Sequence, residues 1–259
     1  MARYFIELSY DGAAYCGWQR QPDAPTVQQA LEKALSTLLR ADIEVVGAGR
    51  TDTGVNASYY VAHFDVAEPI ADPIADPKQL VYKLNLILPH DIAVRRVRRV
   101  KNEVHARFDA REREYTYYIS QRKNPFRRYS AWQYYVSLDV DTMNLAAKSL
   151  LEWDDFTTFA KLNSNNKTNI CRVVKAEWCR DENDPDLLIF TIRADRFLRN
   201  MIRAIVGTLV DVGRGRYSVE EFERILHSCD LSLASAGAPA QGLFLSDVQY
   251  DEDVYEVEN

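Results

Sequence analysis

The sequence predicts an α+β protein made of two similar halves, each with the element order β-α-β-β-α-β. Apolar residues alternate along short runs, as in half-buried strands, and recur every three to four residues along longer runs, as in amphipathic helices. The same order of elements then repeats after residue 104. Such units usually form an antiparallel sheet with helices on one face, which leaves the other face free for RNA or for a cleft between the halves.

The first half, residues 1–104, contains a helix whose start is well marked. Thr26 and Gln29 have the spacing of a capping box, and apolar residues after them form one stripe. A glycine-rich turn separates two of the strands. The expected elements are a strand at 3–9, a helix at 26–40, strands at 43–48 and 58–66, a helix at 77–88 and a strand at 91–100.

The second half, residues 105–250, repeats this order with one extra short helix. Tyr115 and Tyr117 alternate with their neighbours in its first strand, so their side chains share a face. Arg199 and Arg203 are one turn apart in an apolar helical run. The expected elements are a strand at 112–121, a helix at 139–152, strands at 169–179 and 186–194, helices at 197–212 and 218–228, and a strand at 243–250. Residues 251–259 form an acidic tail that we expect to be solvated.

Composition bounds the class of protein. A chain of 259 residues with 47% apolar content can bury a substantial core, in one large or two modest domains. No apolar run approaches a membrane span, the start of the chain lacks a signal-peptide pattern, and the four cysteines form no close pair. We therefore expect a reduced, cytoplasmic protein with no membrane partner. The four histidines are scattered without ligand spacing, so we expect no metal site.

The charge is unevenly distributed. The net charge is −6, but residues 95–128 carry twelve basic side chains against four acidic ones, and a second group of arginines spans 193–216. A solvated strand face could account for either cluster alone. Six tyrosines lie within the first cluster or between the two, and bases stack on aromatic rings while phosphates pair with arginine, so the pattern favours an RNA partner. These tyrosines are Tyr115, Tyr117, Tyr118, Tyr129, Tyr134 and Tyr135.

The segment Gly47–Ala57 places Asp52 in a glycine-rich turn between two strands. Glycine permits backbone angles that other residues resist, and Arg50, two positions earlier, can hold the carboxylate ionised. An ionised carboxylate can attack carbon. Ordinary turn chemistry is the alternative, because Asp and Thr side chains also bond the local backbone.

Other aspartate chemistries fit less well. Asp52-Thr53-Gly54 matches the aspartic-protease triplet, but the guanidinium of Arg50 opposes the raised pKa that a shared proton requires, and no second such triplet exists. A phosphoryl-accepting aspartate lacks its glycine-rich lysine loop. Arg203 lies beside an apolar stripe and needs a carboxylate partner, for which Asp52 is the candidate; a plain surface arginine is the alternative.

These residues resemble the bacterial-type tRNA pseudouridine synthase A family over nearly the whole chain. Single blocks are weak signals, but their order is specific. The matching blocks are Tyr10-Asp11-Gly12, Gly17-Trp18-Gln19-Arg20-Gln21, Thr26-Val27-Gln28, Gly49-Arg50-Thr51-Asp52, His105-Ala106-Arg107-Phe108, Tyr115-Thr116-Tyr117, Asp155-Phe156-Thr157-Thr158-Phe159, Met201-Ile202-Arg203, Val206-Gly207 and Gly242-Leu243-Phe244-Leu245.

The resemblance implies a cofactor-free isomerase that converts uridine to pseudouridine at positions 38 to 40 of the tRNA anticodon stem-loop. Asp52 would be the nucleophile, Tyr115 would pack on the flipped uracil and could assist proton transfer, and Arg203 would pair with Asp52. Arg50 would fill the space of the flipped base, and Thr51, Arg107 and Arg199 complete the expected substrate contacts.

The resemblance also implies an assembly. The two halves would fuse into one mixed, mostly antiparallel sheet, with helices on one face and an active-site cleft on the other. The protein would be a homodimer whose tRNA bridges both protomers. Asn56 departs from the family, because many members carry His there, and an asparagine cannot titrate near neutral pH.

A non-catalytic RNA-binding protein with RRM-like halves is the rival interpretation. It would keep the basic clusters but has no need for an ionised aspartate in a glycine turn. No strand carries the aromatic signature of such proteins.

Overall fold

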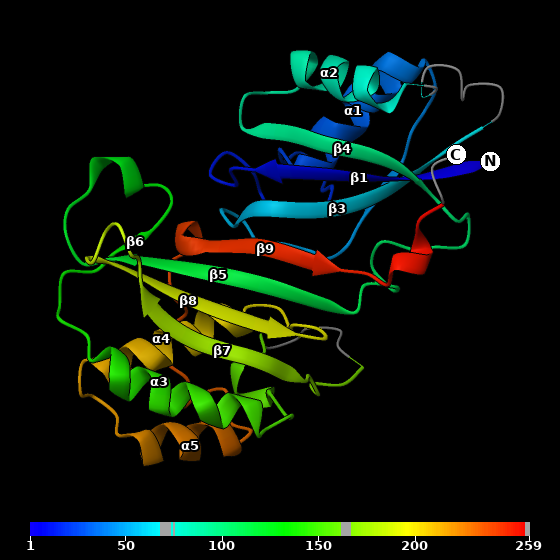
Figure 1. Cartoon of the computed structure of the whole chain (residues 1–259). Coiled ribbons are helices and arrows are strands. Elements are labelled where there is room, and N and C mark those ends of the chain that lie inside the picture. Colours follow the sequence, from blue (N-terminus) through cyan, green and yellow to red (C-terminus); the bar gives the residue numbers. More distant parts are fainter. Residues whose placement is uncertain (68–73, 75, 162–166, 257–259) are drawn as a thin grey trace. The chain divides into compact units, whose positions relative to one another are not determined.

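The computed structural model describes residues 1–67, 74, 76–161 and 167–256 (Figure 1). The chain divides into two compact units. The first is Met1–Arg111 together with Leu245–Asn259, and the second is Glu112–Phe244. Compared with the predicted halves, residues 105–111 and most of the last strand therefore belong with the first unit.

The sheet of the first unit is built around β1 (Ala2–Tyr10), which pairs antiparallel with both β3 (Asn56–Val66) and β4 (Ile92–Val100). The short β2 (Val45–Gly47) pairs antiparallel with β3. Large apolar side chains of β1 and β3 are fully buried and form the core of this unit: Phe5, Ile6, Leu8, Tyr60 and Phe64.

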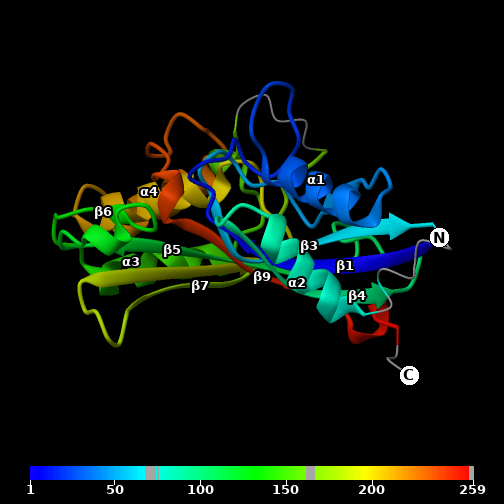
Figure 2. The same cartoon turned by 90° about the horizontal axis from the view of Figure 1, so that it is seen from above.

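Two helices pack on each other in the first unit, and Figures 1 and 2 show them lying together against its strands. α1 (Val27–Leu39) contacts β2, and α2 (Pro77–Ile87) contacts β4. Thr26 caps α1 and supplies one half of the predicted capping box: its hydroxyl accepts from the amide of Gln29 at 3.4 Å. The apolar stripe of α1 is buried through Leu31 and Leu35.

The sheet of the second unit is antiparallel in the order β5 (Glu112–Ser120), β8 (Leu187–Ala194), β7 (Val173–Arg180). An additional strand, β6 (Trp132–Gln133), runs parallel to the end of β5. We did not predict β6, because two residues are too few to show an alternating pattern.

The described part of the second unit also contains three α-helices, labelled α3, α4 and α5 in Figure 1. α3 (Val140–Lys148) contacts β7, α4 (Met201–Gly213) and α5 (Val219–His227). Nearly every side chain of α4 is buried, which fits its almost wholly apolar sequence. α5 starts with a capping box, in which Ser218 and Glu221 satisfy each other's amides.

Within the described part of the chain, nine strands belong to one mixed, mostly antiparallel sheet, accompanied by five α-helices. Its main path is β4-β1-β3-β9-β5-β8-β7, with β9 at Leu243–Gln249. The predicted α+β class is confirmed; β6 and the 3₁₀ turns are additions to the expected elements.

Residues 251–256 of the acidic tail lie along the first unit, while their carboxylates stay exposed to solvent. Three of their carboxylates pair with the basic stretch: Asp251 with Arg111, Asp253 with Lys101 and Glu256 with Arg99. Val254 is buried, and its carbonyl accepts from the amide of Lys101 at 3.1 Å. Three of the basic side chains of residues 95–128 are therefore paired with acidic side chains of the tail at the surface. Residues 257–259 lie outside the described residues.

Among the residues described above, no helix combines the length and the apolar character that a membrane span would need.

Candidate active site

Asp52 lies in the turn that joins β2 to β3, and a second loop, residues 11–18, holds this turn in place. Three hydrogen bonds join the two segments: Trp18 N to Thr51 O (3.3 Å), Gly54 N to Tyr15 O (3.3 Å) and Gly12 N to Asn56 Oδ1 (2.7 Å). Asp52 is half-buried, Thr51 is buried and Arg50 is exposed. The backbone that carries Asp52 is therefore fixed on both sides of the carboxylate.

The close approach of the two loops explains two of the glycines that sequence analysis noted only as motif positions. A Cβ on Gly17 would lie 2.3 Å from Thr51 O, and a Cβ on Gly12 would lie 2.1 Å from Val55 O. Gly17 also has φ of +88°, which L side chains rarely adopt. Any larger residue at either position would push the two loops apart.

The glycines of the turn itself have different roles from those we predicted. Only Gly54 uses a positive φ, at +76°. Gly47 supplies space, because a Cβ there would lie 2.1 Å from Tyr60 Oη and 2.5 Å from Trp18 Nε1. A Cβ on Gly49 would meet no heavy atom within 4 Å.

Three buried aromatic rings pack together next to the turn and support it. Trp18 stacks on Tyr60 with ring centroids 4.1 Å apart, and Tyr10 packs against both. The Tyr10 and Thr51 hydroxyls share a hydrogen bond of 2.8 Å, and the Tyr60 hydroxyl donates to the carbonyl of Gly49. We did not predict that these three aromatic residues support the site, although Tyr10 and Trp18 belong to the motif blocks.

Asn56, the departure from the family pattern, is a structural residue in this chain. It is buried, and its side-chain oxygen accepts from the amide of Gly12. The hydrogen bond ties the loop at residues 11–18 to the end of the Asp52 turn. Its contribution is therefore positional.

Arg107 lies on a separate tight turn of the first unit, at residues 105–109. The ring nitrogen Nδ1 of His105 accepts from the amides of Arg107 and Phe108, at 3.1 and 3.4 Å, and Asp109 accepts from the amide of His105 at 2.7 Å. Beneath the turn, buried His63 accepts from the amide of Ala106 at 3.1 Å. His63 and His105 thus fix the backbone of the turn that carries the exposed side chain of Arg107.

Both histidines must be neutral to make these bonds, because each uses Nδ1 as an acceptor. Burial, with the nearby positive charge of Arg3 and the His105 ring, lowers the pKa of His63 to about 4, while Asp65 acts in the opposite direction. Burial likewise lowers the pKa of His105. Protonation of either histidine at low pH would therefore remove hydrogen bonds that hold this turn.

We expect the free energy of unfolding to fall by up to about 3 kcal/mol as pH drops from 6.5 to 4, because the unfolded chain then binds a proton that native His63 does not. The stabilisation is complete above pH 6.5 and is lost through this window. Urea unfolding at pH 7 and pH 4.5 measures it. His63→Asn keeps an acceptor but cannot titrate, so a pH dependence equal to that of the wild type would contradict the assignment.

Tyr115 lies on β5 of the second unit, opposite Ile192 of β8. It is half-buried, and the ring of Phe197 meets it edge to face with centroids 5.2 Å apart. Tyr117, two residues later, is fully buried, and its hydroxyl donates to the carbonyl of Pro239 at 2.8 Å. The two tyrosines therefore differ: Tyr117 belongs to the core, and Tyr115 keeps part of its ring accessible.

Arg203 lies in the first turn of α4 and is half-buried. Its Nε donates to Ala238 O at 2.6 Å, and its own carbonyl accepts from Ala238 N at 2.9 Å. The predicted helix start at 197 is wrong, because Asn200 adopts φ of +65° and α4 begins at Met201. Arg199 is consequently not one helical turn before Arg203; its carbonyl accepts from Lys161 N at 3.1 Å.

The predicted site residues thus fall into two groups. Arg50, Thr51 and Asp52 share one turn of the first unit, and Arg107 stands on another turn of the same unit. Tyr115, Arg199 and Arg203 belong to the second unit. The predicted pair of Asp52 with Arg203 joins the two units and stays a prediction.

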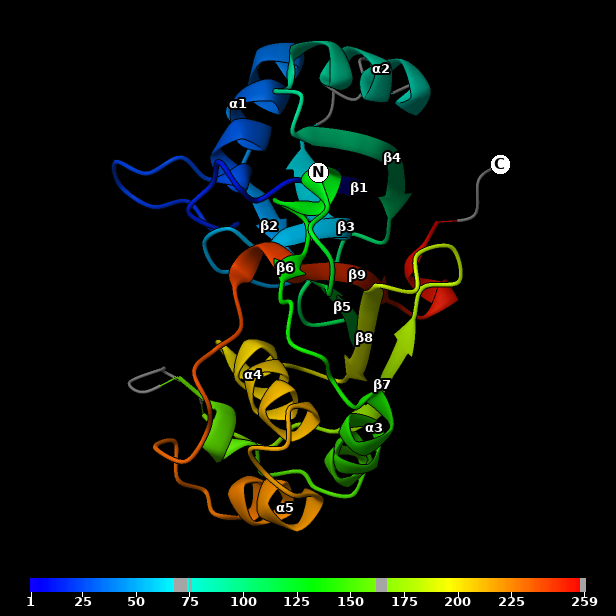
Figure 3. The ribbon, with the colours of Figure 1, turned by 90° about the vertical axis from the view of Figure 1, so that its left-hand side faces the viewer.

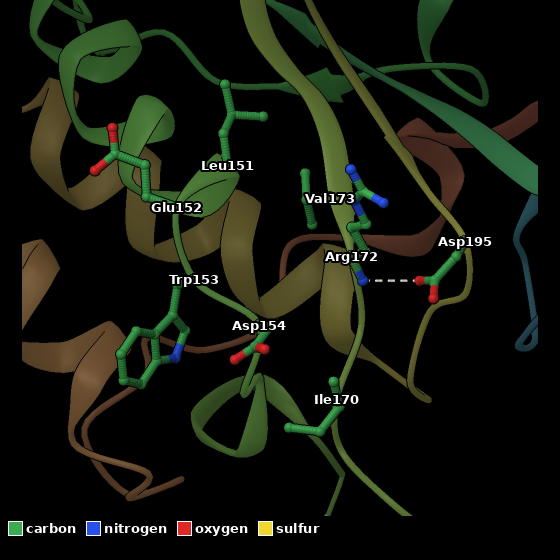
Figure 4. Close-up of a pocket in the computed structure, with 8 residues that line it drawn as sticks. All are labelled: Leu151, Glu152, Trp153, Asp154, Ile170, Arg172, Val173 and Asp195. Atoms are coloured by element: carbon green, nitrogen blue, oxygen red, sulfur yellow. Dashed lines mark hydrogen bonds between the residues drawn. The ribbon is translucent and has the colours of Figure 1, made fainter.

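A shallow pocket of about 420 Å³ opens elsewhere in the second unit (Figure 4). None of the predicted site residues lines it. Three carboxylates, Glu152, Asp154 and Asp195, line it against the single guanidinium of Arg172, so it does not suit a phosphate. No group of three or more His, Cys, Asp or Glu side chains in the described residues is placed to hold a metal ion.

Comparison with known proteins gives a consistent result. The sequence profile of a family described as "tRNA pseudouridine synthase" matches residues 8–109 and 146–251. A tRNA pseudouridine synthase A of Bacteroides thetaiotaomicron is 52% identical over 258 residues, covering 100% of this chain and 94% of that protein. Proteins of the same description are 50% identical in Bacteroides fragilis, over 98% of both chains, and 36% identical in Exiguobacterium sibiricum, over 97% of this chain and 98% of that one.

Proposed function

Because this chain belongs to the tRNA pseudouridine synthase family, we propose that it isomerises uridine to pseudouridine at positions 38 to 40 of the tRNA anticodon stem-loop, with Asp52 as the nucleophile. The observation that carries the assignment of Asp52 is the rigid turn around it. The loop at residues 11–18 and three aromatic rings fix the backbone at Thr51 and Asp52. A preorganised carboxylate loses little entropy when it attacks.

The reaction needs no change of oxidation state. The bond from C1′ to N1 of the uracil breaks, the base turns, and C1′ bonds to C5, while the hydrogen on C5 leaves as a proton and N1 gains one. A carboxylate can attack C1′, attack C6, or first remove a proton from the ribose, and a covalent intermediate divides one difficult step into easier ones. The residues of this chain supply the carboxylate and hold the base.

Tyr115 is our candidate platform for the flipped uracil. Flipping a base out of its stack costs a few kcal/mol, and an aromatic ring in the pocket offsets that cost. The edge-to-face contact with Phe197 holds the Tyr115 ring in one orientation. Stacking needs no titration of the Tyr115 hydroxyl.

Arginines supply the remaining proposed roles. Arg203 pairs with the carboxylate of Asp52. Arg50, exposed two residues before Asp52, fills the space that the flipped base leaves, and Arg107 and Arg199, with Thr51, contact the substrate. Arg50, Arg107 and Arg199 each lie at a turn, so their guanidinium groups can reach a phosphate without disturbing the core.

For the whole molecule we propose an active-site cleft on the sheet face opposite the helices. We also propose that the enzyme is cytoplasmic, because its tRNA substrate is found in the cytoplasm. We also propose a homodimer whose tRNA bridges both protomers. The segment around β6 supports a protein interface, because four large apolar side chains within eleven residues are exposed: Phe126 (92%), Tyr129 (58%), Tyr135 (61%) and Val136 (53%). Aromatic residues and arginine are enriched in protein interfaces, and the Arg128 guanidinium lies 4.4 Å from the Tyr129 ring centre.

The dimer predicts a molecular mass twice that of the 29.8 kDa chain by light scattering. Phe126→Asp should shift the protein towards the monomer, because it would bury a charge in the interface. Tyr82→Asp is the matched control, since Tyr82 is an exposed aromatic (64%) of the first unit. A monomeric wild type would contradict the dimer.

The test of the function is tritium release from tRNA transcripts labelled at C5 of uridine, with mapping of the modified positions. Each turnover removes one hydrogen from C5, so release counts product directly. Release from the anticodon stem-loop is the expected result. Binding without release from any tRNA would favour a binding protein.

A further inference from the structure

One face of α4 is covered by a segment of the chain that follows α5. The residues of this face are four apart, Arg203, Gly207 and Asp211, and each contacts the segment Ser235–Pro239, which we call the strap. In Figure 3 the orange trace that leads from α5 towards β9 passes beside α4. The strap therefore runs along the helix that carries Arg203.

The strap begins at a charged anchor. Asp211 is buried, and its carboxylate accepts from Ser235 Oγ at 2.5 Å and pairs with Arg214 at 2.9 Å and Arg216 at 3.1 Å. The amide of Ser235 donates to Thr208 Oγ1 at 3.2 Å. Because both the amide and the hydroxyl of Ser235 are held, the strap starts from a fixed point.

The middle of the strap lies directly on the helix. A Cβ on Gly207 would come within 2.2 Å of Ala236 O, a backbone atom that cannot swing away as the end of a side chain can. Glycine in a helix interior is unfavourable, so its presence here needs a packing reason. That reason is the close approach of the strap.

The end of the strap holds the guanidinium. Ala238 N donates to Arg203 O at 2.9 Å, and Ala238 O accepts from Arg203 Nε at 2.6 Å. One residue of the strap thus binds both the backbone and the side chain of Arg203. The hydrogen bond to Ala238 O uses Nε and sets the direction of the Arg203 side chain. The two terminal nitrogens of the guanidinium take no part in this bond.

A second anchor connects the strap to the strand that carries Tyr115. The hydroxyl of Tyr117 on β5 donates to Pro239 O, next to Ala238. Burial raises the pKa of Tyr117, so the hydroxyl stays protonated and keeps donating. A Cβ on Gly242 would lie 2.7 Å from the Tyr117 ring, so the chain beyond the strap also packs on this tyrosine.

We infer that the strap positions the Arg203 guanidinium for catalysis, with Gly207, Ser235 and Tyr117 as its positioning residues. The inference rests on the proposed role of Arg203. The strap joins α4 to β5, so it sets Arg203 relative to Tyr115. A small displacement of a catalytic group costs a large factor in rate, whereas tRNA affinity depends mainly on distributed phosphate contacts.

The test compares Tyr117→Phe, Ser235→Ala and Gly207→Ala in single-turnover tritium release and in tRNA binding. We expect each to lower the rate about tenfold or more, with Kd for tRNA within about threefold of the wild type. Ser235→Thr keeps a hydroxyl and should restore most of the rate. Ser232→Ala is the matched control, because Ser232 precedes the strap and its hydroxyl bonds only Asp230 among the described contacts.

A double-mutant comparison separates positioning from general damage. In an Arg203→Lys background the bond from Nε to Ala238 is gone, so Tyr117→Phe and Ser235→Ala should lower the rate no further. Equal losses in both backgrounds, or wild-type rates in all three strap variants, would overturn the inference. Should Gly207→Ala fail to fold, the other two variants decide, since each removes one hydrogen bond only.

The same measurements distinguish the inference from the proposed function. If Arg203→Ala keeps full activity, the proposed role of Arg203 is wrong, and the inference about the strap falls with it. If Arg203→Ala is inactive while the strap variants turn over normally, only the inference is wrong.

Discussion

Replacing Asp52 by alanine or asparagine should abolish tritium release from C5-labelled tRNA while Kd for tRNA changes by less than about tenfold, or about 1.4 kcal/mol. The activity is lost because no other group can form or direct the covalent step. The affinity persists because most of it comes from phosphate contacts, which Asp52 does not make. Asp52→Asn is the stricter variant, since it keeps the shape and the hydrogen-bonding capacity of the side chain.

The control for this prediction is the neighbouring residue. Thr53 is exposed in the same turn, and Thr53→Ala should leave both the rate and the affinity unchanged. Loss of binding together with loss of activity in Asp52→Asn would instead make Asp52 a structural residue of the turn. A lowered melting temperature, caused by release of the loop at residues 11–18, would accompany that outcome.

Elements with strong periodicity could be predicted from the sequence. The apolar stripe after Thr26 predicted α1 within a residue at each end, and the alternating runs predicted β1 and β3. Such a pattern shows which side chains are buried, and it therefore identifies the element whose geometry places those side chains on one face. β6 was not predicted, because its two residues form a strand only through pairing with Ile119 and Ser120, and no local sequence pattern reveals that pairing.

The start of α4 shows why boundaries are harder to predict. Phe197 and Leu198 continue the apolar spacing of the helix, so the pattern extends beyond the helix itself. The chain leaves the helical path at Asn200, where φ is positive, and Phe197 packs on Tyr115. A tertiary contact thus accounts for the apolar residue that local periodicity assigned to the helix.

The candidate site divides in the same way. The turn that carries the proposed nucleophile could be singled out, because a carboxylate between glycines and beside an arginine is visible in a single stretch of sequence. The supports of the turn could not be predicted, since Tyr10, Trp18 and Tyr60 come from three separate segments and meet only in the fold. The strap could not be predicted either. Glycine is unfavourable within a helix, and the close contact of Ala236 with Gly207 that explains it is visible only in the fold.

Arg203→Ala should lower the single-turnover rate by about two to three orders of magnitude, the usual effect of removing a group that stabilises charge at a reacting centre. Arg203→Lys should fall in between, because it keeps a positive charge but loses the planar donors, including the Nε that Ala238 holds. Arg224→Ala is the control, since Arg224 is an exposed arginine of α5 in a surface ion pair with Glu221.

The melting temperature decides whether Arg203 serves catalysis or the fold. Its substitution removes the bond to Ala238 O, which costs about 1 kcal/mol, and a chain of this size should then melt about 2–4 °C lower. A loss of rate with so small a shift means that the guanidinium acts on the reaction. A much larger shift, with activity falling only as the protein unfolds, would make Arg203 a structural residue of the second unit.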